Sequence, residues 1–288
     1  MSPQTPVVPT IPGIDITLAF AAAVLPSSVG MEMQKIEESE TSRLAQNCCP
    51  IVELRQYTLR PGMRDTLIEL FDREFVETQE ALGMKVIGQF RDMNNPDRFV
   101  WLRGFHDMPS RAEALKSFYG GPVWKAHGKA ANATMIDSDN VLLLRPARPR
   151  SGFTNEDVKH PPIDAREIPN GIVTATIYYL NRAGDADFVD IFERALKPIL
   201  AETSASVLAY FVTESSANAF PALPVREGEH VFVCFSGFRD EAAYESHAAA
   251  LARSPRWRSV LTEQSGRSFR RSPEVLKLSP TPRSQLRG

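Results

Sequence analysis

The chain repeats itself, and this internal repeat constrains its fold more than any other feature of the sequence. Tyr57 corresponds to Tyr178 at a spacing that stays constant over the first half of each copy. A longer loop, SSANAFPALPVREGE, then interrupts the second copy, and beyond it Trp124 corresponds to Trp257 at a larger spacing. A spacing that changes at a loop indicates two tandem copies of one structural unit, and such a repeat outweighs local propensities.

Each copy follows the order strand, helix, strand, strand, helix, strand. The predicted elements of the first copy are strands at 51–59, 84–91, 98–105 and 140–145 and helices over 64–82 and from Ser110 to about Tyr119. A further helical stretch carries Trp124. This order is the ferredoxin-like βαββαβ pattern, which has helices on one face of its sheet. We therefore expect an α+β fold in which the two sheets cover each other face to face, as a pseudo-dimer.

The repeat also predicts how the chain is divided. The expected parts are a disordered extension at 1–48, a first domain at 49–146, a linker at 147–170, a second domain at 171–280 and a disordered tail at 281–288. The apolar run at 16–25 is shorter than the ~20 residues that span a bilayer, and no basic residue precedes it as in a secretory signal. We therefore expect no membrane span. Whether Met1, Met31 or Met33 begins the protein is left open.

Charge, cysteines and missing motifs exclude several function classes. The formal net charge of −2 is nearly balanced, which argues against nucleic acid or an acidic membrane as a partner. The three cysteines lack CxxC spacing, which suits a reducing compartment and predicts a cytoplasmic protein. The histidines form no HExxH pattern, so no metal site is expected. Phosphate-binding and dinucleotide-binding glycine motifs are missing too, so no cofactor is evident.

Alternation along the first strand separates a polar face from an apolar one. The polar face carries Glu53, Arg55 and Tyr57, and the other carries Val52, Leu54 and Gln56. We expect the Val52 face to pack on the helices. The Glu53 face should then look toward the neighbouring sheet or a cavity between the sheets, joined by Gln89 and Arg91 of the next strand.

A polar site, if there is one, should lie in the first copy, because Thr174 and Thr176 replace Glu53 and Arg55 in the second. The candidate ligand-binding residues are Glu53, Arg55, Tyr57, Gln89, Arg91, Trp101, Trp124 and His127. A structural interpretation stays open for each kind of residue. The charged residues are then a neutralised buried pair, the aromatic residues are core, and the histidine lies on the surface.

Four long segments resemble bacterial members of the NIPSNAP family: VELRQYTLRPG, FVWLRGF, FYGGPVWKAH and ANATMIDSDNVLLLRP. The resemblance is close over 51–146 and looser over 171–280. It implies a dimeric α+β barrel. That superfamily includes cofactor-independent monooxygenases, EthD-like proteins and haem-binding relatives, so haem is not excluded. The resemblance brings no established catalytic residues with it.

Two hypotheses for function remain. In the first, the chain binds a small apolar or aromatic molecule between the sheet and helices of the first copy, walled by Tyr57, Trp101 and Trp124. Analogy with the superfamily suggests an oxygenase or isomerase-like activity. In the second, the chain is a non-catalytic interaction or scaffold module that acts through protein partners. That hypothesis predicts no enclosed pocket and a polar row consumed by ion pairs between the sheets. Homo-oligomerisation is compatible with both.

Overall fold

The computed structural model describes residues 48–154, 159–182 and 186–288. The predicted extension at 1–48 therefore lies outside the described residues, apart from Cys48. The first repeat comprises β1 (Ile51–Leu59), α2 (Arg64–Leu70), the π-helical turn η1 (Phe71–Phe75), α3 (Val76–Glu80), β2 (Lys85–Asp92), β3 (Arg98–Phe105), α4 (Met108–Gly120), α5 (Pro122–Thr134) and β4 (Met135–Pro146). The second comprises β5 (Ile172–Tyr179), α6 (Ala186–Ile191), η2 (Phe192–Leu196), α7 (Lys197–Glu202), β6 (Ser206–Thr213), β7 (Val231–Phe238), α8 (Glu241–Arg253), α9 (Pro255–Arg267) and β8 (Glu274–Pro280).

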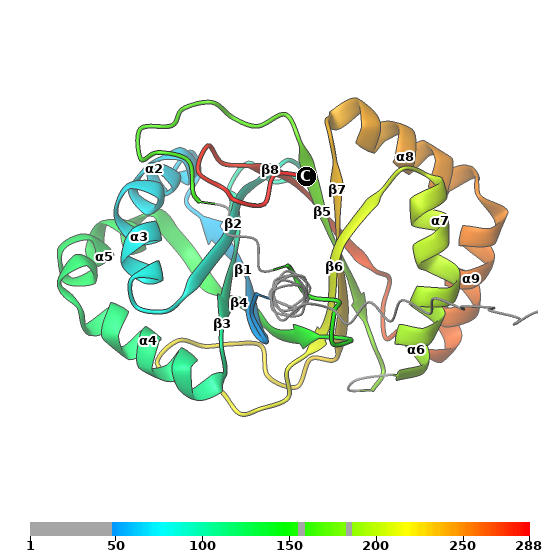
Figure 1. Cartoon of the computed structure of the whole chain (residues 1–288), viewed down its shortest axis with the longest axis horizontal. Coiled ribbons are helices and arrows are strands. Elements are labelled where there is room, and N and C mark those ends of the chain that lie inside the picture. The colour runs from blue at the N-terminus through cyan, green and yellow to red at the C-terminus, as the bar shows by residue number, and fades with distance from the viewer. Residues whose placement is uncertain (1–47, 155–158, 183–185) are drawn as a thin grey trace, which may run out of the picture. The chain divides into compact units, whose positions relative to one another are not determined.

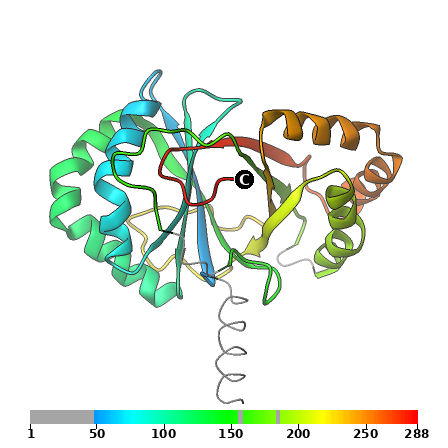
Figure 2. The same cartoon turned by 45° about the horizontal axis from the view of Figure 1, so that its top comes forward.

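The eight strands close into one barrel, in the order β1-β3-β2-β8-β5-β7-β6-β4. Strand β2 pairs with β8, and β4 pairs with β6, so the sheets of the two repeats join along both edges. The helices lie outside the strands, α2 to α5 against the first sheet and α6 to α9 against the second (Figure 1, Figure 2). This architecture confirms the predicted α+β fold of tandem βαββαβ repeats. Among the strands that the structure describes, closure also leaves no sheet edge exposed to other chains.

Apolar side chains from both sheets fill the barrel. Leu54 and Val100 of the first repeat and Val173, Phe211 and Phe235 of the second belong to one buried cluster. The interior between the sheets is therefore a packed core. A ligand site has to be sought between a sheet and its helices.

The prediction of which face of β1 meets the helices was wrong. Val52 and Leu54 point into the barrel, and Gln56 shares their face. Glu53 instead bonds to Arg111 of α4, and Tyr57 packs with Phe71 on the helix side. Both faces of the strand are buried, so alternation alone could not tell them apart. The charged side chains lie on the side where long helix side chains can reach them.

The tail at 281–288, predicted to be disordered, is docked on the barrel. Thr281, Arg283 and Ser284 are almost fully buried. The guanidinium of Arg283 bonds to Glu77 of α3 and to the main-chain oxygen of Asp72. The linker is also partly core, because the ring of Phe153 lies 5.2 Å from that of Phe235 in the barrel interior. Both segments are polar and rich in proline, so their composition alone did not predict these tertiary contacts.

Arg283→Ala tests this docking. The change removes every hydrogen bond that the guanidinium makes, and we expect a loss of about 1–3 kcal/mol in the free energy of unfolding. The partner carboxylate of Glu77 is largely exposed, which keeps the effect below that of a fully buried ion pair. Urea denaturation followed by circular dichroism measures it. The exposed Arg287→Ala is the control, and equal effects of the two variants would contradict a docked tail.

Candidate functional site

The first repeat buries one carboxylate among three arginines, here named the arginine cluster: Glu53, Arg55, Arg103 and Arg111. Glu53 Oε2 accepts from Arg55 Nη1 at 2.9 Å and from Arg103 Nε at 2.8 Å. Its Oε1 accepts from Arg111 Nε at 2.7 Å. All four side chains have no solvent exposure. Burial opposes ionisation of Glu53, but the charges of Arg103, Arg55 and Arg111 outweigh it and hold its pKa far below the usual range.

Strand register and a helix cap assemble this cluster. Antiparallel pairing of β1 with β3 places Glu53 opposite Arg103 and Arg55 opposite Trp101. Asp107 caps α4 by accepting from the backbone N–H of Ser110, which stabilises the first turn of the helix that carries Arg111. The guanidinium carbons of Arg55 and Arg103 lie 5.6 and 5.0 Å from the Trp101 ring centroid, within cation–π range.

The arginine cluster has more donors than acceptors. Among the residues that the structure describes, the Nη2 atoms of Arg55, Arg103 and Arg111 have no hydrogen-bond partner. The indole Nε1 of Trp101 also has none. Arg103 Nη1 does reach Gln79 Oε1 of α3, at 2.9 Å. Buried donors without acceptors cost about 1–3 kcal/mol each, more when charged, so their presence needs an explanation.

The structure brings only part of the predicted site together. Glu53, Arg55 and Trp101 belong to one contact group, and the Tyr57 hydroxyl accepts from Arg55 Nε at 3.0 Å. Gln89 lies on the same face of the sheet, opposite Trp101, but its amide donates to Asp72 at 3.2 Å.

Three of the candidate residues lie apart from the arginine cluster's ion pairs. Arg91 forms an ion pair with the exposed Asp65 of α2. Trp124 packs its ring on Tyr119, with centroids 4.7 Å apart. His127 faces Glu74 at 3.5 Å, with about a third of its side chain exposed.

The second repeat has a cavity of about 370 Å³ between its sheet and its helices α8 and α9. Polar groups in its wall include Thr174, Thr176, Cys234, Ser236 and His247, and Trp257 contributes an aromatic surface. A volume of this size suits a small organic molecule.

The cavity occupies the place that the arginine cluster fills in the first repeat. Thr174 lies opposite Ser236, as Glu53 lies opposite Arg103. The replacements from first to second repeat are Glu53 to Thr174, Arg55 to Thr176, Trp101 to Cys234, Arg103 to Ser236 and Tyr119 to Ala252. Each of these five replacements removes volume, whereas Ala114 to His247 and Gly128 to Leu261 add some back. The same backbone framework therefore holds a packed charge cluster on one side of the barrel and an open space on the other.

His247 is an ionisable side chain in the wall of the cavity, and sequence reasoning did not select it. It is buried on α8, with Nδ1 3.2 Å from the carbonyl oxygen of Thr203. A carbonyl only accepts, so Nδ1 carries the proton and Nε2 is left as the acceptor. Burial lowers the pKa of His247, which keeps the ring neutral. Burial also raises the pKa of Cys234 to about 12, so its thiol stays protonated.

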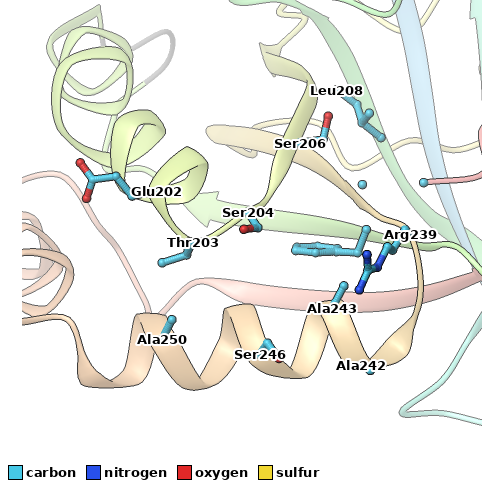
Figure 3. A pocket seen from close by; sticks show the side chains of 13 residues that line it. Glu202, Thr203, Ser204, Ser206, Leu208, Arg239, Ala242, Ala243, Ser246 and Ala250 are labelled. Atoms are coloured by element: carbon cyan, nitrogen blue, oxygen red, sulfur yellow. The ribbon is translucent and has the colours of Figure 1, made fainter.

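A larger groove of about 790 Å³ lies on the other side of α8, where α7 turns into β6 (Figure 3). Its lining is mostly small, with Ser204, Ser206 and Ser246 among the labelled side chains. Glu202 and Arg239 lie at opposite ends of the view and pair with Arg256 and Asp240 respectively. The groove therefore offers no convergent chemistry, and the cavity between the sheet and helices α8 and α9 is the better candidate site.

Two other kinds of site find no support in the part of the chain that the structure describes. No cluster of three or more histidine, cysteine, aspartate or glutamate side chains there has the arrangement to hold a metal ion. No helix within 48–154, 159–182 and 186–288 combines the length and apolarity needed to cross a membrane.

Comparison with known proteins bears on the family and the fold. Residues 52–149 match the NIPSNAP family model. A candidate monooxygenase from Lactobacillus acidophilus NCFM is 12% identical over 81% of this chain and 94% of its own, with a TM-score of 0.48. An anthrone oxidase-like protein is 13% identical over 80% and 91%, with a TM-score of 0.49. A NIPSNAP family protein from Agrobacterium tumefaciens is 24% identical over 33% and 91%, with a TM-score of 0.32. No curated protein matches the chain in sequence.

Proposed function

From the premise that residues 52–149 form a NIPSNAP domain, we propose that the chain binds one small, neutral, largely apolar or aromatic molecule in the cavity of the second repeat. The observation that carries this proposal is the volume of about 370 Å³ at a place that the first repeat fills. Close packing is the norm in protein interiors, so a space of this size points to a ligand.

The lining determines the class of ligand. Among the described residues around the cavity there is no aspartate, glutamate, lysine or arginine, which favours an uncharged molecule. Trp257 and Leu251 offer apolar surface. Hydroxyl groups of Thr174 and Ser236 can orient one polar substituent.

His247 extends the proposal toward catalysis. Its Nε2 atom can accept a hydrogen bond or a proton from a hydroxyl or an acidic C–H of the bound molecule. Proton abstraction of this kind is the first step that an isomerase-like or cofactor-independent oxygenase activity would need. The proposal therefore has two levels, which are binding of the molecule and, more specifically, catalysis of this kind on it.

The scaffold hypothesis finds less support. It expected a polar row consumed by ion pairs between the sheets, but the polar residues of β1 face the helices instead. It also expected no enclosed pocket near Tyr57, and the first repeat is indeed packed there, but a cavity lies at the counterpart Tyr178 in the second repeat. We therefore keep binding of a small molecule as the one proposed function.

Ala248→Leu tests the site by filling it. Ala248 lines the cavity, and the first repeat carries Leu115 at this position, so the helix tolerates the larger side chain. We expect the fluorescence enhancement of the neutral probe N-phenyl-1-naphthylamine to require about tenfold more protein in the variant, from loss of about 1.4 kcal/mol of binding. The exposed neighbour Ala249→Leu is the matched control and should bind as wild type. Equal binding by both variants, or no enhancement by wild type, would reject the proposal.

A further inference from the structure

The arginine cluster holds more positive charge than its own carboxylate can balance. Three guanidinium groups share Glu53, which leaves two positive charges in excess at zero solvent exposure. Arginine stays protonated in proteins, so the excess cannot be relieved by losing a proton. Buried charge without a partner is among the most costly arrangements in a protein. The cluster therefore calls for an additional negative group.

A loop from the second repeat covers this cluster. Residues 214–230 connect β6 to β7, and the yellow segment in Figure 1 reaches past β3 toward α4. Asn218 Oδ1 accepts from Arg111 Nη1 at 2.9 Å. Phe220 stacks on Tyr119, with ring centroids 6.0 Å apart and an interplanar angle of 15°. This loop is the insertion that distinguishes the second repeat, so the second repeat completes a site on the first.

The partner that the loop offers to Arg111 is neutral. Asn218 Oδ1 also accepts from the backbone N–H of Phe220 at 3.1 Å, and Asn218 Nδ2 donates to the carbonyl of Leu223 at 3.0 Å. The amide thus caps one arginine without contributing charge. An anionic oxygen in the position of Asn218 Oδ1 would form a charge-assisted hydrogen bond with Arg111 instead of a neutral one.

We infer that the arginine cluster is a binding site for a small oxyanion, a carboxylate or a phosphate, which displaces Asn218 from Arg111. The oxyanion takes the bond from Arg111 and the unpartnered Nη2 donors of Arg55 and Arg103. Guanidinium forks match the geometry of both oxyanions, and the bound charge offsets the buried excess. This site is distinct from the neutral cavity of the second repeat.

Calorimetric titration of the full chain with inorganic phosphate and, separately, benzoate tests the inference. The two probes distinguish a phosphoryl from a carboxylate ligand. Asn218→Asp is the informative variant, because it places a carboxylate beside Arg111 at a half-buried loop position and gives up only the bond that Nδ2 donates to Leu223. We expect at least one probe to bind wild type and the variant to bind it about tenfold or more weakly, since its own carboxylate competes.

Ala219→Asp adds the same charge to the neighbouring loop residue and is the matched control, expected to bind within about twofold of wild type, a small free-energy difference. Ala248→Leu should leave binding of the oxyanion unchanged, which separates this site from the cavity. Binding of neither probe, or equal binding by Asn218→Asp and Ala219→Asp, would overturn the inference.

Discussion

Glu53→Gln is expected to lower the free energy of unfolding by about 3–5 kcal/mol, the largest effect that any single change described here should have. Glutamine keeps the shape of the side chain but removes the charge that three buried arginines share. Arg103 and Arg111 would then stay charged at zero exposure with no carboxylate in contact. Removing one partner of a buried ion pair costs far more than the pair contributes, because the other charge is left desolvated.

Urea denaturation at pH 7 measures this effect, with thermal unfolding as a check on any variant that is too unstable for a baseline. Glu74→Gln is the matched control, since Glu74 pairs with Arg73 near the surface, and its effect should stay below about 1 kcal/mol. Added phosphate should restore part of the stability of Glu53→Gln if the cluster binds oxyanions. If Glu53→Gln lowers the free energy of unfolding no more than Glu74→Gln does, then the charges of the three arginines are screened in solution.

The sequence predicted the repeat, and with it the α+β fold. The constant spacing between matching residues such as Tyr57 and Tyr178 reveals two copies of one topology, and no knowledge of tertiary contacts is needed to see it. It could not predict which face of β1 meets the helices. Val52 and Glu53 are both buried, and hydrophobic alternation identifies a solvent face, which this strand does not have. The side on which Glu53 lies depends on partners from elsewhere in the chain, above all Arg111 on α4.

The candidate site was predicted in part for a related reason. Glu53 and Arg55 were found from the alternation along their strand, and Trp101 was found as a candidate aromatic wall, whereas Arg103 and Arg111 were missed. Arg103 did leave a signal, a charged residue in the middle of the apolar run FVWLRGF. The sequence also contained a signal for the cavity, because Thr174 and Ser236 are much smaller than their counterparts Glu53 and Arg103. The contact of Asn218 with Arg111 spans two repeats and depends on the path of a loop, which no residue pattern specifies.

Asp72→Asn is expected to stabilise the protein at pH 8 by about 2–3 kcal/mol and to have no effect below about pH 4. Asp72 lies on η1, almost fully buried, and accepts from Gln89 Nε2 at 3.2 Å. Burial raises its pKa from 3.8 to about 6, despite the nearby Arg283. Asparagine has the same shape, keeps an acceptor for Gln89 and carries no charge to desolvate.

The direction of the pH dependence follows from the raised pKa. The folded state holds the proton of Asp72 more tightly than the unfolded state, so this stabilising contribution is complete below about pH 4 and is lost as pH rises through about 6. Wild type should therefore lose stability relative to Asp72→Asn between these values, and urea denaturation at half-unit pH steps measures the difference. The exposed Asp65→Asn is the control and should track wild type without such a step. The prediction is contradicted if the free energies of unfolding of wild type and Asp72→Asn differ by the same amount from pH 4 to pH 8. Asp72 would then already be ionised at pH 4, because Arg283 stabilises its charge more strongly than burial opposes it.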